Sequence, residues 1–409
     1  MTPDLGHSDQ RREAPQGGAV TPDLRNSDKI REAPQGGAST RLAMFVSNYL
    51  PHPGGLEVMV WNLARGLARR HDVVLVTSAY DGVHGISDED GMTVHRLPAV
   101  HVTERFGVPY PVPAGPGLRA ALRDVAGAQI IHSHGALYAQ SILARQLARR
   151  ARVPFVLTEH VGFVQYPSAA LNAIQRAAWT AIGTPLVRSA DAVVTYNARV
   201  HDELERRSGR EVRFVGNGVD VERFHARSCE ERRALRRSFG LPEEGVLALF
   251  AARDSEKKNL DVLLRAERAG YTLVVCGWER NLMGRALVDL GVVPYARMAE
   301  LFACADVMLH PASGEGFPLA VQEAIASGLP VVLLWDEGYA RWMPRTIVEG
   351  CATPEEVPHR MEQLARDPAR RRALGETGRA WAESQWSWDA TVRAYERIYD
   401  DVADDSTRS

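Results

Sequence analysis

The sequence predicts an α/β protein made of two doubly wound, Rossmann-like domains that face a cleft. The chain has 409 residues, which is more than a single hydrophobic core usually serves. A succession of short apolar strand, loop and helix begins at residue 41 and starts again at residue 246. Residues 305–332 show strand, loop, helix and second strand in direct succession, which is the repeating unit of a parallel sheet.

Composition narrows the class of protein. With 45% hydrophobic and 24% charged residues, the chain is typical of soluble globular proteins. A formal net charge of −2 argues against nucleic acid as a partner, because proteins that bind it usually carry a large basic surplus. The cysteines are scattered without a C-x-x-C pair, so neither a zinc site nor a disulfide framework is predicted. No apolar run approaches the roughly 18 residues that span a bilayer, and the first residues lack a signal-peptide pattern. We therefore expect a cytoplasmic protein.

Residues 1–40 are expected to form a disordered tail. Residues 2–19 and 21–38 are an imperfect tandem copy, rich in proline, glycine and charge. Such a segment cannot bury enough apolar surface to offset the entropy that it loses on ordering. A duplicated or misannotated start and a docking role are equal alternatives for its origin.

The first domain is predicted over residues 41–222. It opens with a buried strand, a loop and a helix over residues 56–70, on which apolar residues recur at helical spacing. The loop ends in Gly54 and Gly55, which would let the backbone approach a ligand phosphate. A glycine pair is also common in simple tight turns, so the pair alone does not establish a phosphate site.

Two further strands of this domain lead to histidines. A buried strand at 129–131 is followed by His134, and another at 155–157 is followed by His160. The carboxyl ends of parallel strands meet at one edge of the sheet, where open α/β sheets bind ligands. A histidine in such a place is more often structural than catalytic, so the residues alone leave both roles open for His160.

The second domain is predicted over residues 223–383. Its first strand, at 246–250, leads to a loop that carries Arg253 and Lys258. Two cations across a turn could neutralise a diphosphate, although a basic loop is more often merely solvated. Gly277 follows the next strand of this domain.

Two glutamates flank the junction between a loop and a helix after the strand at 307–309. Glu315 lies in a loop whose glycines and proline specify the backbone, and Glu323 lies about one turn into the helix. Both would lie at the carboxyl end of the strand, where the helix amino terminus offers free N–H groups to an anion. Glutamates at this spacing also occur on many solvent-facing helices, so the spacing alone does not decide their role.

The motif E-G-F-P-L-x-x-x-E at 315–323, followed by A-x-x-S-G-x-P-V-V at 324–332, resembles a known signature. It is similar to the E-x7-E motif of retaining, nucleotide-sugar-dependent glycosyltransferases of family 4, which have the GT-B fold. P-x-x-G-G-x-E at 51–57, N-G-V-D at 217–220 and R-x4-K at 253–258 resemble further elements of this family. Two departures occur beside the last element: Ala252 replaces the family's glycine, and Lys257 adds a second charge.

The resemblance implies an EC 2.4 enzyme that moves a sugar with retention from a nucleoside diphosphate donor to an acceptor hydroxyl or amine, releasing the diphosphate. It implies that the terminal segment, residues 384–409, crosses back as a helix onto the first domain. The catalytic residues that it implies are His160, Glu315, Arg253 and Lys258. The donor-binding residues that it implies are Gly54, Gly55, Arg253, Lys258, Gly277, Glu315, Gly316, Phe317, Pro318, Leu319 and Glu323. The expected acceptor-binding residues are His134 and His160, of which His160 is also implied by the resemblance.

No metal ion or other cofactor is expected, because the nucleotide-sugar is a substrate and cations meet its leaving group. Asp88 and Asp90 match the D-x-D spacing by which the other large glycosyltransferase fold holds a metal. They stand between two strand-like pieces and precede a glycine, which is typical of a hairpin. The segment 278–292 is shorter than in the family, which leaves the nucleotide base unassigned.

The expected partners are a nucleotide-sugar donor and a small-molecule, lipid or glycan acceptor. The alanine-rich helical stretch at 171–188 is expected to pack between layers, with at most peripheral contact to a greasy acceptor or a membrane surface. Alternative functions are a GT-B isomerase or phosphorylase, and a non-enzymatic two-lobed sugar-binding protein. The sequence leaves the sugar, the acceptor and the oligomeric state open.

Overall fold

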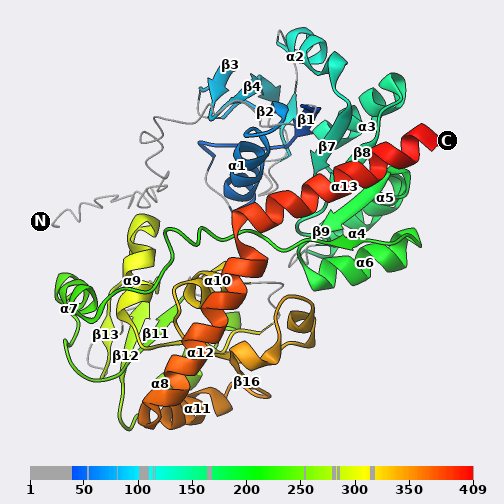
Figure 1. Cartoon of the computed structure of the whole chain (residues 1–409). Coiled ribbons are helices and arrows are strands. Elements are labelled where there is room, and N and C mark those ends of the chain that lie inside the picture. Colours follow the sequence, from blue (N-terminus) through cyan, green and yellow to red (C-terminus); the bar gives the residue numbers. More distant parts are fainter. Residues whose placement is uncertain are drawn as a thin grey trace, which may run out of the picture.

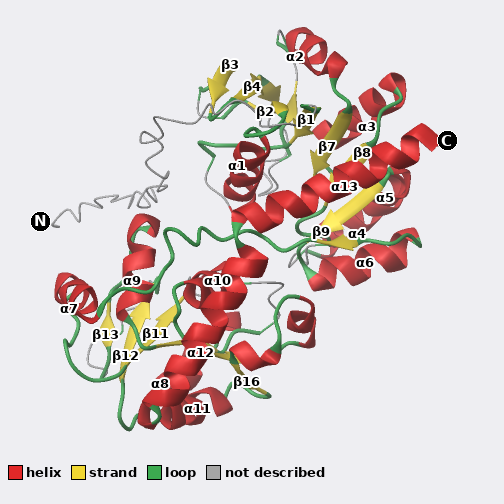
Figure 2. Cartoon of the chain, viewed as in Figure 1, coloured by secondary structure: helices red, strands yellow, loops and turns green. Residues whose placement is uncertain are grey.

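The structure is a computed structural model that describes residues 39–52, 55–80, 82–100, 110–113, 115, 117–163, 168–252, 255–278, 282, 286–313 and 318–408. Almost the whole of the tail expected at 1–40 lies outside these residues. The chain forms two α/β halves, one above the other in Figure 1. Helices cover both faces of each sheet, as Figure 2 shows.

In the described part of the chain, eight strands form the sheet of the first half, in the order β10-β9-β8-β7-β1-β2-β4-β3. Its neighbouring strands are parallel except for the hairpin of β3 and β4. The strands are β1 (Arg41–Phe45), β2 (Asp72–Ser78), β3 (Gly85–Glu89), β4 (Met92–Leu97), β7 (Ile130–His134), β8 (Phe155–Thr158), β9 (Ala192–Thr195) and β10 (Arg213–Phe214). A separate antiparallel pair joins β5 (Ala99–Val100) to β6 (Val112–Pro113).

The second half contains a parallel sheet of six described strands, in the order β13-β12-β11-β14-β15-β16. These strands are β11 (Leu247–Ala251), β12 (Thr272–Cys276), β13 (Val288–Asp289), β14 (Val307–His310), β15 (Val331–Leu334) and β16 (Glu349–Cys351). The restart of the pattern at residue 246 therefore marks the start of a second sheet.

Each half has its own helices, and the last helix of the chain returns to the first half (Figure 1). Those of the first half in Figure 1 are α1 (Gly55–Leu67), α2 (Leu118–Asp124), α3 (Ala139–Ala151), α4 (Ala169–Ala178), α5 (Thr184–Ser189), α6 (Ala198–Ser208) and α13 (Trp388–Arg408). Those of the second half are α7 (Cys229–Ser238), α8 (Leu260–Arg265), α9 (Met298–Cys304), α10 (Leu319–Ala326), α11 (Glu356–Arg366) and α12 (Pro368–Trp381).

The apolar strand runs are buried on both faces of the sheets, which explains why they read as continuous rather than alternating. In β1, Leu42 and Met44 face the core under α1 and α13, whereas Ala43 and Phe45 face the core under α2, α3 and α5. The alternation follows from the two-residue repeat of a strand.

The ends of two helices in the second half follow from the backbone and capping residues beside them. In α8, Asn259 adopts a left-handed conformation with φ 53° and the helix starts after it, and the helix ends before Ala266, whose backbone is extended. In the charged region 222–240, only α7 is helical. It starts where Ser228 and Glu231 form a capping box, in which each side chain bonds to the other's backbone.

The chain passes between the two halves twice, and the two crossings are bonded to each other. The Val219 amide donates to the Trp386 carbonyl at 2.6 Å, and the Thr391 hydroxyl donates to the Gly216 carbonyl at 3.0 Å. From the second crossing, α13 runs back along the first half (red in Figure 1). Val392, Tyr395 and Tyr399 pack in the same core as α1, which confirms the predicted crossover helix.

We expect Gly218→Ala to destabilise the protein by about 1–3 kcal/mol, because a Cβ there would overlap the rigid indole of Trp388. Gly216→Ala is the matched control in the same crossing, since the nearest atom to its Cβ would lie at an ordinary 3.6 Å. Thermal unfolding of both variants checks this. Equal melting temperatures for the two variants would contradict the close packing of Trp388 on the crossing.

Candidate active site

The basic loop after β11 is tied to the loop after β14. These strands are neighbours in the second sheet, so both loops leave the same edge. The Ser313 amide donates to the Lys257 carbonyl at 2.9 Å, and the Asn259 side-chain amide donates to the Pro311 carbonyl at 2.9 Å. Lys258 is half-buried in a single 3-10 turn, Glu256–Lys258, between these contacts. The segment that carries Lys258 therefore lies against the start of the loop that carries Glu315.

Glu323 is a buried carboxyl group on α10. The Tyr295 hydroxyl donates to its Oε1 at 2.7 Å, and the Arg223 guanidinium lies 4.4 Å from the centre of the Tyr295 ring. Burial raises the pKa of Glu323 to about 7, against the opposing effects of the Tyr295 hydrogen bond and the Arg223 charge. Burial, the Glu323 charge and the bond to Glu323 raise the pKa of Tyr295, so its hydroxyl stays a donor. One carboxylate oxygen of Glu323 is thus engaged inside the protein.

Three other predicted residues lie at this same edge. Gly277 directly follows β12 with φ 82°, a conformation that favours glycine, and its amide donates to the Gly291 carbonyl at 2.7 Å. Pro318 precedes α10 at its N-cap position, and Leu319 begins the helix with a side chain that is 40% exposed. The structure therefore brings Lys258, Gly277 and the start of α10 to the carboxyl edge of the second sheet.

His134 and His160 meet at the carboxyl edge of the first sheet. His134 ends β7, His160 follows β8, and His134 Nδ1 lies 3.0 Å from His160 Nε2. Both rings are buried, and burial lowers the pKa of His160 to about 3 and that of His134 well below its usual range. Both imidazoles are therefore neutral at pH 7, and one donates a hydrogen bond to the other.

The loop that carries His160 is fixed by Glu159, which is buried. Its Oε1 accepts from the amides of His160, Val161 and Gly162, each at 3.1 Å. Its Oε2 accepts from the Ala136 amide at 2.6 Å, which joins this loop to the one after β7. A carboxylate that accepts several amide bonds is stabilised without a cation.

The two sheet edges face each other across the junction. The His160 ring lies 5.4 Å from Tyr196, which follows β9, and Tyr196 lies 6.3 Å from Trp342 of the second half. The Gln322 side-chain amide, next to Glu323 on α10, donates to the Asn217 carbonyl of the first crossing at 2.5 Å. The predicted donor and acceptor residues that are described therefore lie at facing edges.

Two protein-family models match most of the chain. Residues 53–223 match the model described as Glycosyltransferase Family 4, and residues 231–381 match that described as Glycosyl transferases group 1. The chain belongs to glycosyltransferase family 4. It is therefore an enzyme that transfers a glycosyl group from a nucleotide-sugar donor, and the resemblance read from the E-x7-E motif is confirmed.

Named relatives agree with the family. A GDP-mannose-dependent alpha-mannosyltransferase of Mycolicibacterium smegmatis is 28% identical over 332 residues, covering 76% of this chain and 83% of the relative. A D-inositol 3-phosphate glycosyltransferase of Saccharomonospora viridis is 29% identical over 403 residues, covering 85% and 89%. Anabaena Alr3699/HepE, solved with UDP-glucose, superposes with a TM-score of 0.65 at 14% identity, covering 88% of this chain and 99% of that one. This likeness confirms the GT-B fold.

Several predicted site residues of this glycosyltransferase lie outside the described part of the chain. They are Gly54, Arg253, Glu315, Gly316 and Phe317. Gly55 is the first residue of α1, immediately after the undescribed end of the loop. Their roles remain predictions from the family motifs.

Sequence reasoning missed two residues that hold the site. Tyr295, which bonds to Glu323, lies 28 positions earlier in a segment that carries no motif, so no local signal pointed to it. Glu159 directly precedes His160, and a carboxylate at the end of a buried strand was a signal that could have been used.

The acidic residues of the D-x-D segment are engaged in the β3–β4 hairpin. Glu89 pairs with Arg96, Asp90 accepts from the Trp61 indole at 2.8 Å, and Asp88 accepts from the Thr93 hydroxyl at 3.3 Å. The expected hairpin is therefore confirmed.

Among the described residues, the cluster close enough to hold a metal ion is His201, Asp202 and Glu205 on α6. Arg341 of the second half already places its guanidinium on His201 Nδ1 at 2.6 Å and on Asp202 at 2.8 Å. This cluster is therefore a contact between the halves.

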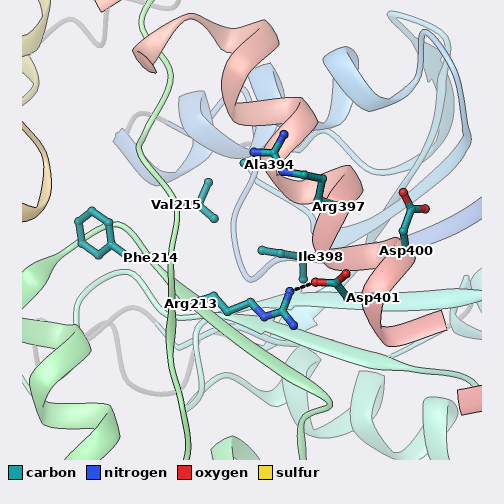
Figure 3. A pocket seen from close by; sticks show the side chains of 8 residues that line it. All are labelled: Arg213, Phe214, Val215, Ala394, Arg397, Ile398, Asp400 and Asp401. Carbon is teal, nitrogen blue, oxygen red and sulfur yellow. Dashed lines mark hydrogen bonds and ion pairs between the residues drawn. The ribbon is translucent and has the colours of Figure 1, made fainter. Parts of the chain in front are cut away.

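A pocket of about 400 Å³ lies between β10 and α13 (Figure 3). It is lined by Arg213, Phe214, Val215, Ala394, Arg397, Ile398, Asp400 and Asp401, and Arg213 pairs with Asp401 across it. None of the predicted donor or acceptor residues lines this pocket.

No helix in the described part of the chain has both the length and the apolar character needed to cross a bilayer.

We expect Glu323→Gln to stabilise the glycosyltransferase at pH 8 and to change its stability little at pH 4.5. A carboxyl whose pKa rises from 4.5 to about 7 on folding makes the native state bind more protons between these values. Stability therefore falls as pH rises through this window, by about 3 kcal/mol in all, and glutamine removes that loss.

Melting temperatures of both proteins across this pH range measure the effect. Glu267→Gln is the control, because Glu267 is exposed on the same half and its replacement should leave the two pH curves parallel. Parallel curves for the Glu323 variant as well would contradict a buried, proton-binding carboxyl.

Proposed function

We propose that this enzyme transfers a hexosyl group with retention from a nucleoside diphosphate sugar held by the second half to an acceptor hydroxyl or amine held by the first. One observation carries the proposal. The Lys258 turn is hydrogen-bonded to the start of the E-x7-E loop, and the buried Glu323 lies on the helix that follows that loop. A cation and a carboxyl thus lie at one sheet edge. This arrangement suits a nucleoside diphosphate, whose phosphates need a cation and whose ribose hydroxyls need an acceptor.

Lys258 and Arg253 are proposed to face the diphosphate. Negative charge grows on the leaving diphosphate as the glycosidic bond breaks, so fixed cations stabilise the transition state more than the ground state. The amino terminus of α10 offers further N–H groups to the same anion. Glu315 is proposed to hold the sugar hydroxyls and to orient the anomeric carbon.

Glu323 is proposed to accept the hydrogen bonds of the ribose hydroxyls. Because the Tyr295 hydroxyl already occupies one lone pair of Oε1, the structure supports one ribose bond to Oε2 and a shared bond at Oε1. The raised pKa adds a condition: the carboxyl must be ionised to accept from both hydroxyls, so donor binding should weaken below about pH 7.

His160 is proposed to lie against the donor sugar, with His134 behind it at the acceptor side. Both are neutral, so they act by hydrogen bonding and not by charge. Closure of the two halves would exclude water that otherwise hydrolyses the donor. The names of the relatives, a mannosyltransferase and an inositol 3-phosphate glycosyltransferase, support a hexose donor and a polyol-type acceptor. Membership of a transferase family does not favour the isomerase, phosphorylase or sugar-binding alternatives.

We expect Lys258→Ala and Glu323→Gln to fail in different ways. The lysine variant should lose kcat strongly, because its interaction grows toward the transition state. The glutamine variant should mainly raise the donor KM, by the equivalent of about 1.5–3 kcal/mol, because it removes a charge that strengthens ribose hydrogen bonds.

GDP-mannose and UDP-glucose serve as purine and pyrimidine donor probes, with release of the nucleoside diphosphate as the readout. Lys257→Ala is the control, because it removes the same charge from the adjacent residue, whose side chain is exposed. Equal and mild effects of the Lys258 and Glu323 changes on both constants would show that neither residue faces the donor.

We expect donor turnover to persist in excess chelator and in Asp88→Ala. Cations of the protein are proposed to meet the leaving group, and Asp88 accepts a hairpin bond from Thr93. Turnover with and without EDTA, followed by addition of Mg²⁺ or Mn²⁺, checks this. Loss of activity that a divalent ion restores would contradict a metal-independent departure of the diphosphate.

A further inference from the structure

A buried network of hydrogen bonds connects the terminal helix α13 with the histidines of the first sheet. The Tyr399 hydroxyl lies 2.8 Å from His132 Nδ1, and His132 Nε2 lies 2.8 Å from the Thr158 hydroxyl. The Tyr395 hydroxyl lies 3.2 Å from that same threonine oxygen. All four side chains are at least nine-tenths buried.

This network holds the His132 ring from both sides. His132 is neutral, since burial and the neighbouring His160 lower its pKa to about 3, so one ring nitrogen donates and the other accepts. Hydroxyl groups can serve either nitrogen, because each can donate or accept. Two fixed partners at opposite nitrogens leave the ring no free rotation about its last bond.

The held ring in turn supports the pair at the proposed site. The centre of the His132 ring lies 4.3 Å from that of His134, and His134 bonds to His160 at 3.0 Å. The outer nitrogens of this pair, His134 Nε2 and His160 Nδ1, have no hydrogen-bond partner among the described residues, although both rings are buried. Buried polar atoms are nearly always satisfied, so these two nitrogens keep a hydrogen-bonding capacity that no described residue takes up.

We propose that Tyr399, through His132, positions the His134–His160 pair for glycosyl transfer, so that the seating of α13 sets the geometry of the acceptor side. The inference rests on the proposed role of His160 at the donor sugar. Tyr399 and His132 are positioning residues, and neither needs to touch substrate. Helix α13, which follows the second half in the chain, would thereby support the part of the site that the first half provides.

Tyr399→Phe tests the proposal, because it removes one oxygen and leaves the ring that packs against the first sheet. We expect kcat for release of the nucleoside diphosphate from whichever donor probe turns over to fall by about tenfold or more, and the donor KM to change by less than about threefold. Ile398→Val is the control: it trims the adjacent buried residue of α13 without touching the network, and should lower the melting temperature but leave kcat unchanged.

A double variant separates positioning from general loss of structure. If Tyr399 acts through His160, then Tyr399→Phe should reduce kcat no further in a His160→Ala background. Tyr395→Phe, which removes the hydroxyl beside Thr158, provides the same comparison if the first variant folds poorly.

The outcomes distinguish the positioning role of Tyr399 from the proposed role of His160 at the donor sugar. Reduced kcat in each single variant with no further loss in the double variant supports the inference. An unchanged kcat in Tyr399→Phe, or losses that add in the double variant, would overturn the inference and leave the proposed function intact. An unchanged kcat in His160→Ala would overturn the role of His160 itself, and the inference with it.

Discussion

The arrangement of this glycosyltransferase depends on the packing of α13 against the first sheet. The helix follows directly from the second half, yet Val392, Tyr395, Ile398 and Tyr399 are buried in the core of the first. Its root is bonded to the other crossing through Val219 and Trp386. The two connections together restrict how the halves can move relative to one another. The carboxyl edges of both sheets consequently stay opposite each other, and a site with a donor side and an acceptor side becomes possible.

The groups placed at these edges are ones that burial does not favour. A carboxyl with a pKa near 7 and a cluster of neutral histidines contribute less to stability than apolar side chains of similar size would. The protein retains them with specific partners: Tyr295 for Glu323, and hydroxyls of α13 and β8 for His132. Such partners fix each group in one orientation before substrate arrives, which is the condition for strong electrostatic and hydrogen-bonding effects in a transition state.

Much of this architecture could be predicted from the sequence because it depends on local patterns. Apolar runs predicted the parallel strands, the family resemblance predicted the crossover helix, and glycines marked the loops at the strand ends. The contacts that complete the site could not be predicted, because they join residues that are distant in sequence. Tyr399 and His132 are 267 positions apart, and neither belongs to a motif.

Hydrogen exchange followed by mass spectrometry tests most directly whether one ligand is held by both sheet edges. Exchange is measured for the enzyme alone, with the nucleoside diphosphate, and with a non-hydrolysable analogue of a donor. The analogue is made from whichever donor probe, GDP-mannose or UDP-glucose, is a substrate. The account predicts that the diphosphate slows exchange in residues 255–263 and 318–327 of the second half. The intact donor should add protection in residues 158–163 of the first half, where the His160 loop lies. Protection that is confined to one half with either ligand, or that appears only at the pocket beside α13, would contradict a site shared between the two edges.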